Sequence, residues 1–243
     1  MANKSKVVKE LFENTALYLT YDYNLQIRKE TVEAFTSGMN FTNVLDIPSG
    51  TGAISIPLLN RTEKLTLIDI SSNMLGIAHK NIPENYLIKT EIINADFFEL
   101  NLPENSYDLI ICLGLLAHVN SPEQLLIKVA SLLKPGGILI IQNTDAAHIY
   151  SYSIRFYLWL KNIIHKQTYK LNEVSDAFIK TKLNSTNLEL FKCYRYNQSF
   201  LGFSNLFSNE KKYSLTRKLF GDATKPKNQS LGSDYTYLFK KKS

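Results

Sequence analysis

Three aspartates each stand at or just after the end of a short apolar segment. Asp46 ends VLD, Asp69 ends LTLID, and Asp96 follows EIINA. Carboxylate oxygens accept hydrogen bonds and attract cationic groups. The carboxyl ends of parallel strands meet at one edge of a sheet, where open α/β proteins bind their ligands. If the three segments are such strands, their carboxylates surround one ligand.

The heptapeptide DIPSGTG, residues 46–52, has the pattern of a strand end, a tight turn and a helix start, which commonly holds a nucleotide. Gly50 and Gly52 match the first two positions of a dinucleotide fingerprint, but Ser55 stands at the third. A carboxylate at Asp46 would repel a pyrophosphate and would suit a cationic group, such as that of an amino acid. No Gly-Lys-Ser/Thr follows, so a P-loop is excluded.

The other two acids suit the remaining parts of a nucleoside ligand. Asp69 lies 23 residues after Asp46 and can accept hydrogen bonds from two ribose hydroxyls. Asp96 can accept from an exocyclic amine, and Phe97 beside it can pack on a flat base. The alternative for Asp69 is a purely structural role as the cap of a helix that starts near Ser72.

Short apolar runs alternate with helical patterns in the first part of the chain, which predicts βαβ units and a parallel sheet buried on both faces. Ser121 is expected to cap a helix that has Pro122 at its first position and Gly136 just past its end. The predicted strands are 44–47, 65–69, 91–96, 107–114 and 137–143, and the predicted helical stretches between them are 53–61, 72–82 and 121–137.

The pattern changes after Asn143. Residues 145–166 form a long aromatic-rich stretch that we expect to be helical, and 172–186 predict a second helix. Residues 188–198 and 234–242 predict two late strands. No linker-like composition separates this tail from the rest, so we expect it to complete the same sheet and to cover a substrate.

Composition excludes several classes of protein. The 243 residues carry a net charge of +6, which weakly favours acidic partners but is more typical of a solvated surface. Two cysteines and no Cys-x-x-Cys pair exclude a disulfide framework. The N-terminus has no apolar leader and no apolar stretch is long enough for a membrane span, so we expect a cytoplasmic protein.

Five motifs together resemble the class I S-adenosylmethionine (SAM)-dependent methyltransferases, especially the small-molecule type that acts on quinones and natural products. They are DIPSGTG, Asp69, Asp96-Phe97, YDLIICLGLLAHV and LLKPGG. The resemblance covers residues 12–143 well and the tail in outline. It implies SAM as the cofactor, with S-adenosylhomocysteine (SAH) as its product.

The resemblance also implies the architecture. We expect an α/β, Rossmann-like three-layer sandwich with a mostly parallel seven-stranded sheet, a late antiparallel strand, an N-terminal helical segment and an aromatic-rich cover. One domain would span residues 1–243. Within it, 1–40 would be a helical cap, 41–143 the cofactor-binding core, and 144–243 the substrate cover and the last two strands.

Matching positions assign the cofactor contacts. Pro48 stands where the family usually has glycine, and since proline fixes φ the turn should be stiffer. The methionine part of SAM would be lined by Asp46, Pro48, Gly50 and Gly52. The ribose, the adenine and the neighbouring cofactor surface would contact Asp69, Ile70, Asp96, Phe97, Leu113 and Gly114.

The acceptor side is less determined by the sequence. Tyr21 matches a position where relatives often place a tyrosine over the methyl group, with Tyr18 nearby; the alternative is a ring packed on the sheet edge. His118 is a candidate base or a loop-holding group. Asp145 and His148 follow the fifth strand, where acceptors usually bind, with Asp145 a candidate substrate contact and His148 a further candidate base. Tyr152 lies in the aromatic stretch, which either forms core or lines an acceptor pocket.

Methyl transfer from a sulfonium is an in-line displacement that needs positioning and exclusion of water, and a general base only for some acceptors. We therefore expect transfer to an oxygen or nitrogen of a small-molecule acceptor, without a metal, since Leu113 and Gly114 provide no carboxylate ligand. The alternatives are a nucleic-acid methyltransferase, a peptide methyltransferase and a non-catalytic SAM-binding protein. The first is disfavoured because LGLLAH stands after the fourth strand, where DNA amino-methyltransferases have the motif that holds the flipped base. The sequence indicates neither the acceptor nor the oligomeric state.

Overall fold

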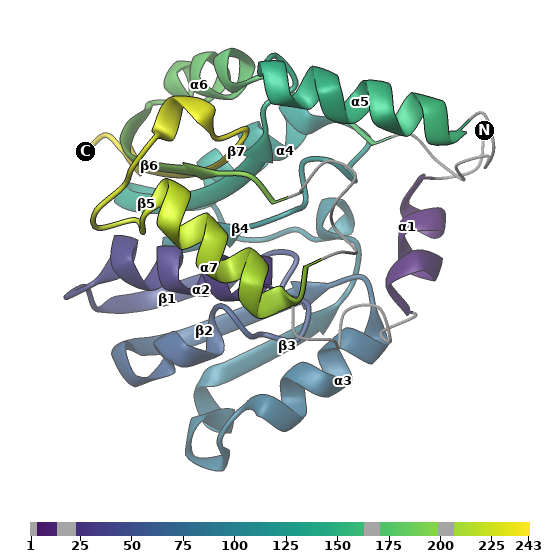
Figure 1. The fold of residues 1–243 in the computed structure, drawn as a ribbon. Helices are drawn as coiled ribbons and strands as arrows, with labels where there is room; N and C mark the ends of the chain where they lie inside the picture. The colour runs from purple at the N-terminus through teal and green to yellow at the C-terminus, as the bar shows by residue number, and fades with distance from the viewer. Residues whose placement is uncertain (1–3, 14–22, 163–170, 199–206) are drawn as a thin grey trace.

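The computed structural model describes residues 4–13, 23–162, 171–198 and 207–243. One seven-stranded sheet has the order β3-β2-β1-β4-β5-β7-β6 (Figure 1). All strands run parallel except β7, which is antiparallel to both of its neighbours. The strands are β1 (Phe41–Asp46), β2 (Thr62–Asp69), β3 (Thr90–Asn94), β4 (Tyr107–Cys112), β5 (Leu133–Thr144), β6 (Leu188–Tyr196) and β7 (Asp234–Lys241). The predicted fold class is confirmed.

Helices cover both faces of the sheet, which gives three layers (Figure 1). The α-helices are α1 (Lys4–Glu13), α2 (Tyr23–Thr36), α3 (Ser72–Asn81), α4 (Pro122–Leu132), α5 (Ile149–Asn162), α6 (Asp176–Ser185) and α7 (Asn209–Phe220). None of them, within the ranges given above, is long and apolar enough to cross a membrane.

Alternate residues of the central strands enter two separate cores. In β1, Val44 packs in the core shared with α2, α3 and α7, while Leu45 packs in the core shared with α4 and α6. In β4, Leu109 and Ile110 divide in the same way, and all four side chains are fully buried. Burial on both faces explains why these strands are continuous apolar runs.

Two predicted helical segments differ from the structure. The stretch predicted at 53–61 forms only a short 3₁₀ helix (Ile56–Arg61), with a proline in its first turn. Helix α4 has the predicted cap, since Ser121 Oγ accepts from Gln124 N at 3.2 Å, but it ends at Leu132. Gly136 therefore lies inside β5, because Leu133 already pairs with Tyr107 of β4.

The tail adds both predicted late strands to the same sheet. Strand β7 lies between β5 and β6, and its first residue, Asp234, pairs with Thr144 and Tyr196. The end of β5, the end of β6 and the start of β7 are far apart in sequence but thus lie side by side at one edge of the sheet. Helix α7 was not predicted from the sequence.

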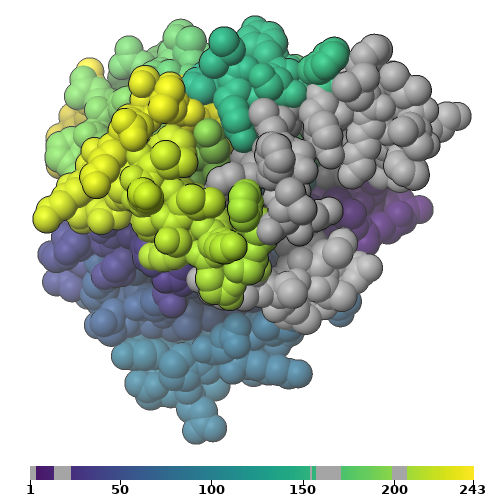
Figure 2. Space-filling view, in the orientation of Figure 1, coloured from purple at the N-terminus to yellow at the C-terminus, as the bar shows by residue number. Residues whose placement is uncertain are grey.

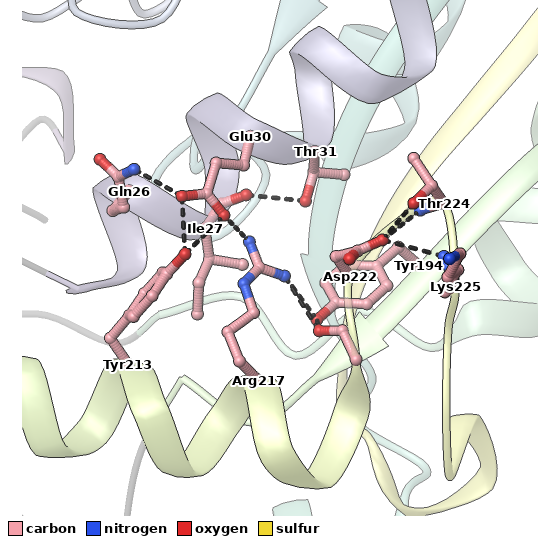
Figure 3. A network of polar contacts seen from close by, with 11 residues as sticks. Gln26, Ile27, Glu30, Thr31, Tyr194, Tyr213, Arg217, Asp222, Thr224 and Lys225 are labelled. Atoms are coloured by element: carbon pink, nitrogen blue, oxygen red, sulfur yellow. Dashed lines mark hydrogen bonds and ion pairs between the residues drawn. The ribbon is translucent and has the colours of Figure 1, made fainter.

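A polar network joins α7 to α2 and β6 (Figure 3). Glu30 of α2 accepts from Tyr213 Oη at 2.8 Å and forms an ion pair with Arg217. Arg217 Nη1 also donates to Tyr194 Oη at 3.1 Å and to Gly221 O at 3.0 Å. Helix α7 packs against α2 and β6, and in the space-filling view its yellow-green surface adjoins the purple surface of the N-terminal part of the chain (Figure 2). This network fixes α2 relative to the last part of the sheet.

Arg217→Ala should lower the free energy of unfolding by about 1–3 kcal/mol, because it removes the ion-pair partner of the half-buried Glu30 carboxylate and a donor to the Tyr194 hydroxyl. Urea denaturation of the purified protein measures the change. Lys218→Ala, an exposed position on the same helix, is the matched control. Equal stability of the two variants would show that the network does not hold α7.

Candidate functional site

A cavity of about 450 Å³ opens at the carboxyl ends of β1, β2 and β4. It is enclosed on other sides by residues of α1 and α2. Ten of the residues predicted for the site line it: Asp46, Pro48, Gly50, Asp69, Ile70, Asp96, Phe97, Leu113, Gly114 and His118. The three strand-end aspartates are therefore brought together around one enclosed space.

Asp46 is the most deeply buried of these acids, with a relative exposure of 2%. Burial raises the pKa of its carboxyl to about 7, while a hydrogen bond from Ser55 Oγ at 2.5 Å lowers it and the charge of Asp69 raises it further. Ser55, which does not match the third small-residue position of the dinucleotide fingerprint, thus donates a hydrogen bond to Asp46. A cationic ligand group beside Asp46 would favour the ionised carboxylate.

The two glycines of the turn have different tasks. Gly50 has a φ of +53°, donates its N–H to Asp69 Oδ2 at 2.8 Å, and has open space where a Cβ would stand. Gly52 has a φ of +70°, and a Cβ there would lie 2.4 Å from Ile56 Cδ1. Gly52 is not among the residues that line the cavity, and its lack of a Cβ allows the turn to pack on the 3₁₀ helix. The Ile47–Pro48 peptide bond is cis.

Asp69 is held by backbone N–H groups. It accepts from Gly50 N and, at 2.9 Å, from Ser71 N. Burial raises the pKa of its carboxyl, and these hydrogen bonds oppose the rise. The cap of α3 is Ser71, whose Oγ accepts from Met74 N at 3.2 Å, so Asp69 is not used as that cap. Its oxygens keep lone pairs for ligand hydroxyls.

Asp96 and Phe97 form the corner of the cavity nearest α1. Asp96 accepts from Phe98 N at 3.0 Å and from Ser5 Oγ at 2.6 Å. The ring of Phe97 is 5% exposed, with Lys128 Nζ 4.5 Å from its centroid. Ser5 was not identified from the sequence, because nothing local to α1 indicates a contact with a residue 91 positions away.

Helix α1 is fastened at both ends. Lys4 Nζ donates to Val119 O at 3.0 Å and to Asn172 Oδ1 at 2.9 Å. The Glu13 carboxylate accepts from the first two N–H groups of α3, Ser72 N at 3.1 Å and Asn73 N at 3.3 Å. A carboxylate is favourable at a helix N-terminus, so this contact holds α1 over the cavity.

His118 lies on the cavity with its ring edge-on to Phe12, the centroids 5.3 Å apart. Burial lowers the pKa of the imidazole to about 4, and the positive charge of Lys4 lowers it further. His118 is therefore neutral at pH 7. A neutral imidazole has an acceptor nitrogen, but one of low basicity.

Three further residues predicted for the acceptor side do not line this cavity: Asp145, His148 and Tyr152. Asp145 accepts from the backbone N–H groups of Ala147 and Asp176, both at 3.0 Å, so its carboxylate supports the loop after β5. His148 Nε2 lies 3.0 Å from Ser230 O. Tyr152 is 58% exposed and lies beside a second, more open cavity near the starts of α4 and α6. Tyr18 and Tyr21 fall outside the described residues.

The sequence-based interpretation missed a polar side of the cavity. Asn24 and Arg28 of α2 line it, and so does Gln198, just after β6. The spacing of Asn24 and Arg28 on one helix face was the available signal; for Gln198 there was none. Among the described residues, no three His, Cys, Asp or Glu side chains are grouped to hold a metal ion.

Comparison with known proteins gives consistent similarities. A family profile described as a methyltransferase domain matches residues 45–141. A demethylmenaquinone methyltransferase of Oceanobacillus iheyensis is 29% identical over 175 residues, which cover 67% of this chain and 72% of that protein. The enzyme of the same name from Listeria welshimeri is 31% identical over 134 residues, 54% of this chain and 56% of the relative. The chain thus aligns with little more than half of the second relative.

The fold also has known counterparts. The crystal structure of magnesium protoporphyrin IX methyltransferase from Synechocystis with bound SAH matches with a TM-score of 0.65 and 16% sequence identity, over 98% of this chain and all of that one. At this identity the likeness concerns the fold.

The low pKa of His118 can be tested directly. Its imidazole resonances should not move between pH 5.5 and 8, because burial keeps the ring neutral above a pKa of about 4. NMR of the four histidines measures this, and the spectrum of His118→Gln identifies the signal. A His118 titration midpoint above pH 6 would contradict the described burial.

Proposed function

We propose that the chain is a class I SAM-dependent methyltransferase and that it transfers the SAM methyl group to an oxygen or nitrogen of a small planar acceptor. The observation that carries the proposal is the group of three strand-end carboxylates around one largely apolar cavity. We also propose that residues 1–243 form one domain, since β6 and β7 continue the sheet of the cofactor strands.

The proposed cofactor position follows from the donors and acceptors of the cavity. The cationic amine of the methionine part would pair with Asp46, and the ribose hydroxyls would donate to Asp69. The adenine would lie between Ile70 and Phe97, with its amine donating to Asp96 beside Ser5. Leu113 and Gly114, directly after β4, would contact the methionine part, as would Pro48 and Gly50.

The proposed reaction is an in-line displacement. A lone pair of the acceptor forms the new bond to the methyl carbon while the bond to sulfur breaks, and the sulfur leaves as the neutral thioether of SAH. Apolar side chains such as Val8, Phe12 and Val119 line the cavity and keep water away from the sulfonium. The chain therefore contributes mainly position and desolvation, which are the large terms for such a transfer.

His118 is the group we propose for the acceptor side of the cavity. A hydroxyl acceptor loses its proton during transfer, and the neutral ring of His118 can accept that hydrogen bond. A neutral amine needs no base before it attacks. Tyr21 stays a prediction for the same side. Asp145, His148 and Tyr152 are left out of the proposal, because none of them lines the cavity.

The relatives named as demethylmenaquinone methyltransferases favour a planar, quinone-like acceptor. The test is incubation with SAM and a panel of hydroquinones, phenols and aromatic amines, with mass spectrometry for the methylated product. Formation of SAH with a methylated small molecule supports the proposal. Methylation of protein or RNA in the same assay, with no small molecule modified, would overturn it.

Asp69→Ala should weaken SAH binding by about 1–3 kcal/mol, because the ribose hydroxyls would lose their acceptor. Calorimetric titration measures this. Glu63→Ala is the matched control, since Glu63 is exposed at the opposite end of the same strand. Unchanged affinity in Asp69→Ala would contradict the ribose contact.

SAH binding should release a proton near pH 6.5. The free Asp46 carboxyl has a pKa of about 7, so it is largely protonated there, and an amine cation beside it lowers that pKa. Affinity should therefore rise from pH 6 to pH 8. Calorimetry in two buffers of different ionisation enthalpy counts the proton. If Asp46→Asn releases as many protons as the unmodified protein, Asp46 does not contact the amine.

A further inference from the structure

The loop that follows β4, residues 113–121, forms one wall of the cavity. Within it, His118 N donates to Leu115 O at 2.9 Å, and this turn carries the imidazole. Leu116 is buried in the core shared with α4 and α6. The carbonyl groups of residues 116, 117 and 119 stand on either side of His118. Backbone carbonyls in a folded chain need hydrogen-bond partners, and these three find theirs outside the loop.

Asn172, which lies between α5 and α6, donates to all three carbonyls. Its side-chain Nδ2 donates to Leu116 O at 2.9 Å and to Val119 O at 2.7 Å. Its backbone N donates to Ala117 O at 2.9 Å. One residue thus binds the loop at three points around His118.

Lys4 of α1 determines which way the amide of Asn172 points. Its Nζ donates to Asn172 Oδ1 at 2.9 Å and to Val119 O at 3.0 Å. An ammonium group only donates and a carbonyl group only accepts, so the amide must present its oxygen to Lys4 and its nitrogen to the loop. An aspartate could not replace Asn172, because its second oxygen would face two carbonyl oxygens.

The same contacts connect His118 with the helix that packs on its ring. The imidazole stands edge-on to Phe12 of α1, and Lys4 belongs to that helix. Burial is the main cause of the low pKa of the imidazole, and the positive charge of Lys4 adds to it. Asn172 therefore holds the loop that carries the ring and also the cation that acts on it.

We propose that Asn172 is a positioning residue for methyl transfer, which holds the imidazole of His118 at the acceptor side of the cavity by binding the carbonyls around it. Asn172 is not among the described residues that line the cavity, so it acts through His118 and not by contact with acceptor or cofactor. The proposal rests on the proposed role of His118 in transfer to a hydroxyl acceptor.

The first test asks whether Asn172 holds the imidazole, and it needs no methyl transfer. Asn172→Ala removes the side-chain hydrogen bonds to the loop and to Lys4. The imidazole should then gain water, so its pKa should rise toward the ordinary value of 6.5 and its NMR resonances should move between pH 5.5 and 8. Asn184→Ala, at an exposed position of α6, is the control and should leave His118 unchanged. Resonances of His118 that stay constant over this range in Asn172→Ala overturn the proposal.

The second test is a double-mutant cycle on turnover with a hydroxyl acceptor. Asn172→Ala should lower kcat about tenfold, while SAH affinity by calorimetry changes less than about twofold. In the His118→Gln background the same substitution should lower kcat no further, because no imidazole is left to position. An equal fall of kcat in both backgrounds would contradict action through His118 and leave Asn172 a purely structural role.

The two proposals fail in different ways. A failed acceptor screen contradicts the proposed function alone, and the NMR test then still decides whether Asn172 holds the imidazole. If Asn172→Ala does not fold, as judged by circular dichroism, the unmodified protein decides. The side-chain amide protons of Asn172 should exchange with solvent at least about tenfold more slowly than those of Asn184, and equal rates overturn the proposal.

Discussion

The site depends on the burial of carboxylates at one edge of a parallel sheet. Asp46 and Asp69 are nearly excluded from water, and the charge of Asp69 disfavours ionisation of Asp46. Desolvation is costly for an ionised group unless polar partners replace water. The glycine turn supplies such a partner, because the left-handed conformation of Gly50 aims its N–H at Asp69. The Ser55 hydroxyl and the N–H of Ser71, just before α3, are further donors that replace water at these carboxylates.

The sequence predicts a feature of the site well when residues close in sequence determine it, and poorly when distant residues do. Asp46, Asp69 and Phe97 could be assigned because each follows a strand, and the ends of parallel strands converge by geometry. The close packing of Gly52 on Ile56 could not be predicted from the pattern of the turn. Asp145 and His148 could not be placed, since the loop after β5 turns toward Asp176 and Ser230, contacts made by residues 31 and 82 positions later.

The missed side of the cavity is the most non-local part of the fold. Arg28 and Gln198 are 170 residues apart, and they meet because β7 joins β6 to the sheet and brings its end beside Thr144. Helix α2 is fixed there by the contact of Glu30 with α7, two residues from Arg28. No sequence periodicity in α2 or in β6 predicts that Arg28 and Gln198 are in contact. Cavity residues that are brought together in this way can be identified only from the three-dimensional structure.

The fastening of α1 has a consequence for how this fold diversifies. The family profile ends at residue 141 and begins at 45, yet the cavity is closed by Ser5 on one side and by Gln198 on another. The region that the family profile matches therefore lacks two sides of the cavity, and the flanking ends of the chain complete it. Substitutions in those ends can alter what the enclosure admits while Asp46 and Asp69 stay unchanged. The selectivity of the cavity can therefore change in evolution while the contacts of Asp46 and Asp69 are kept.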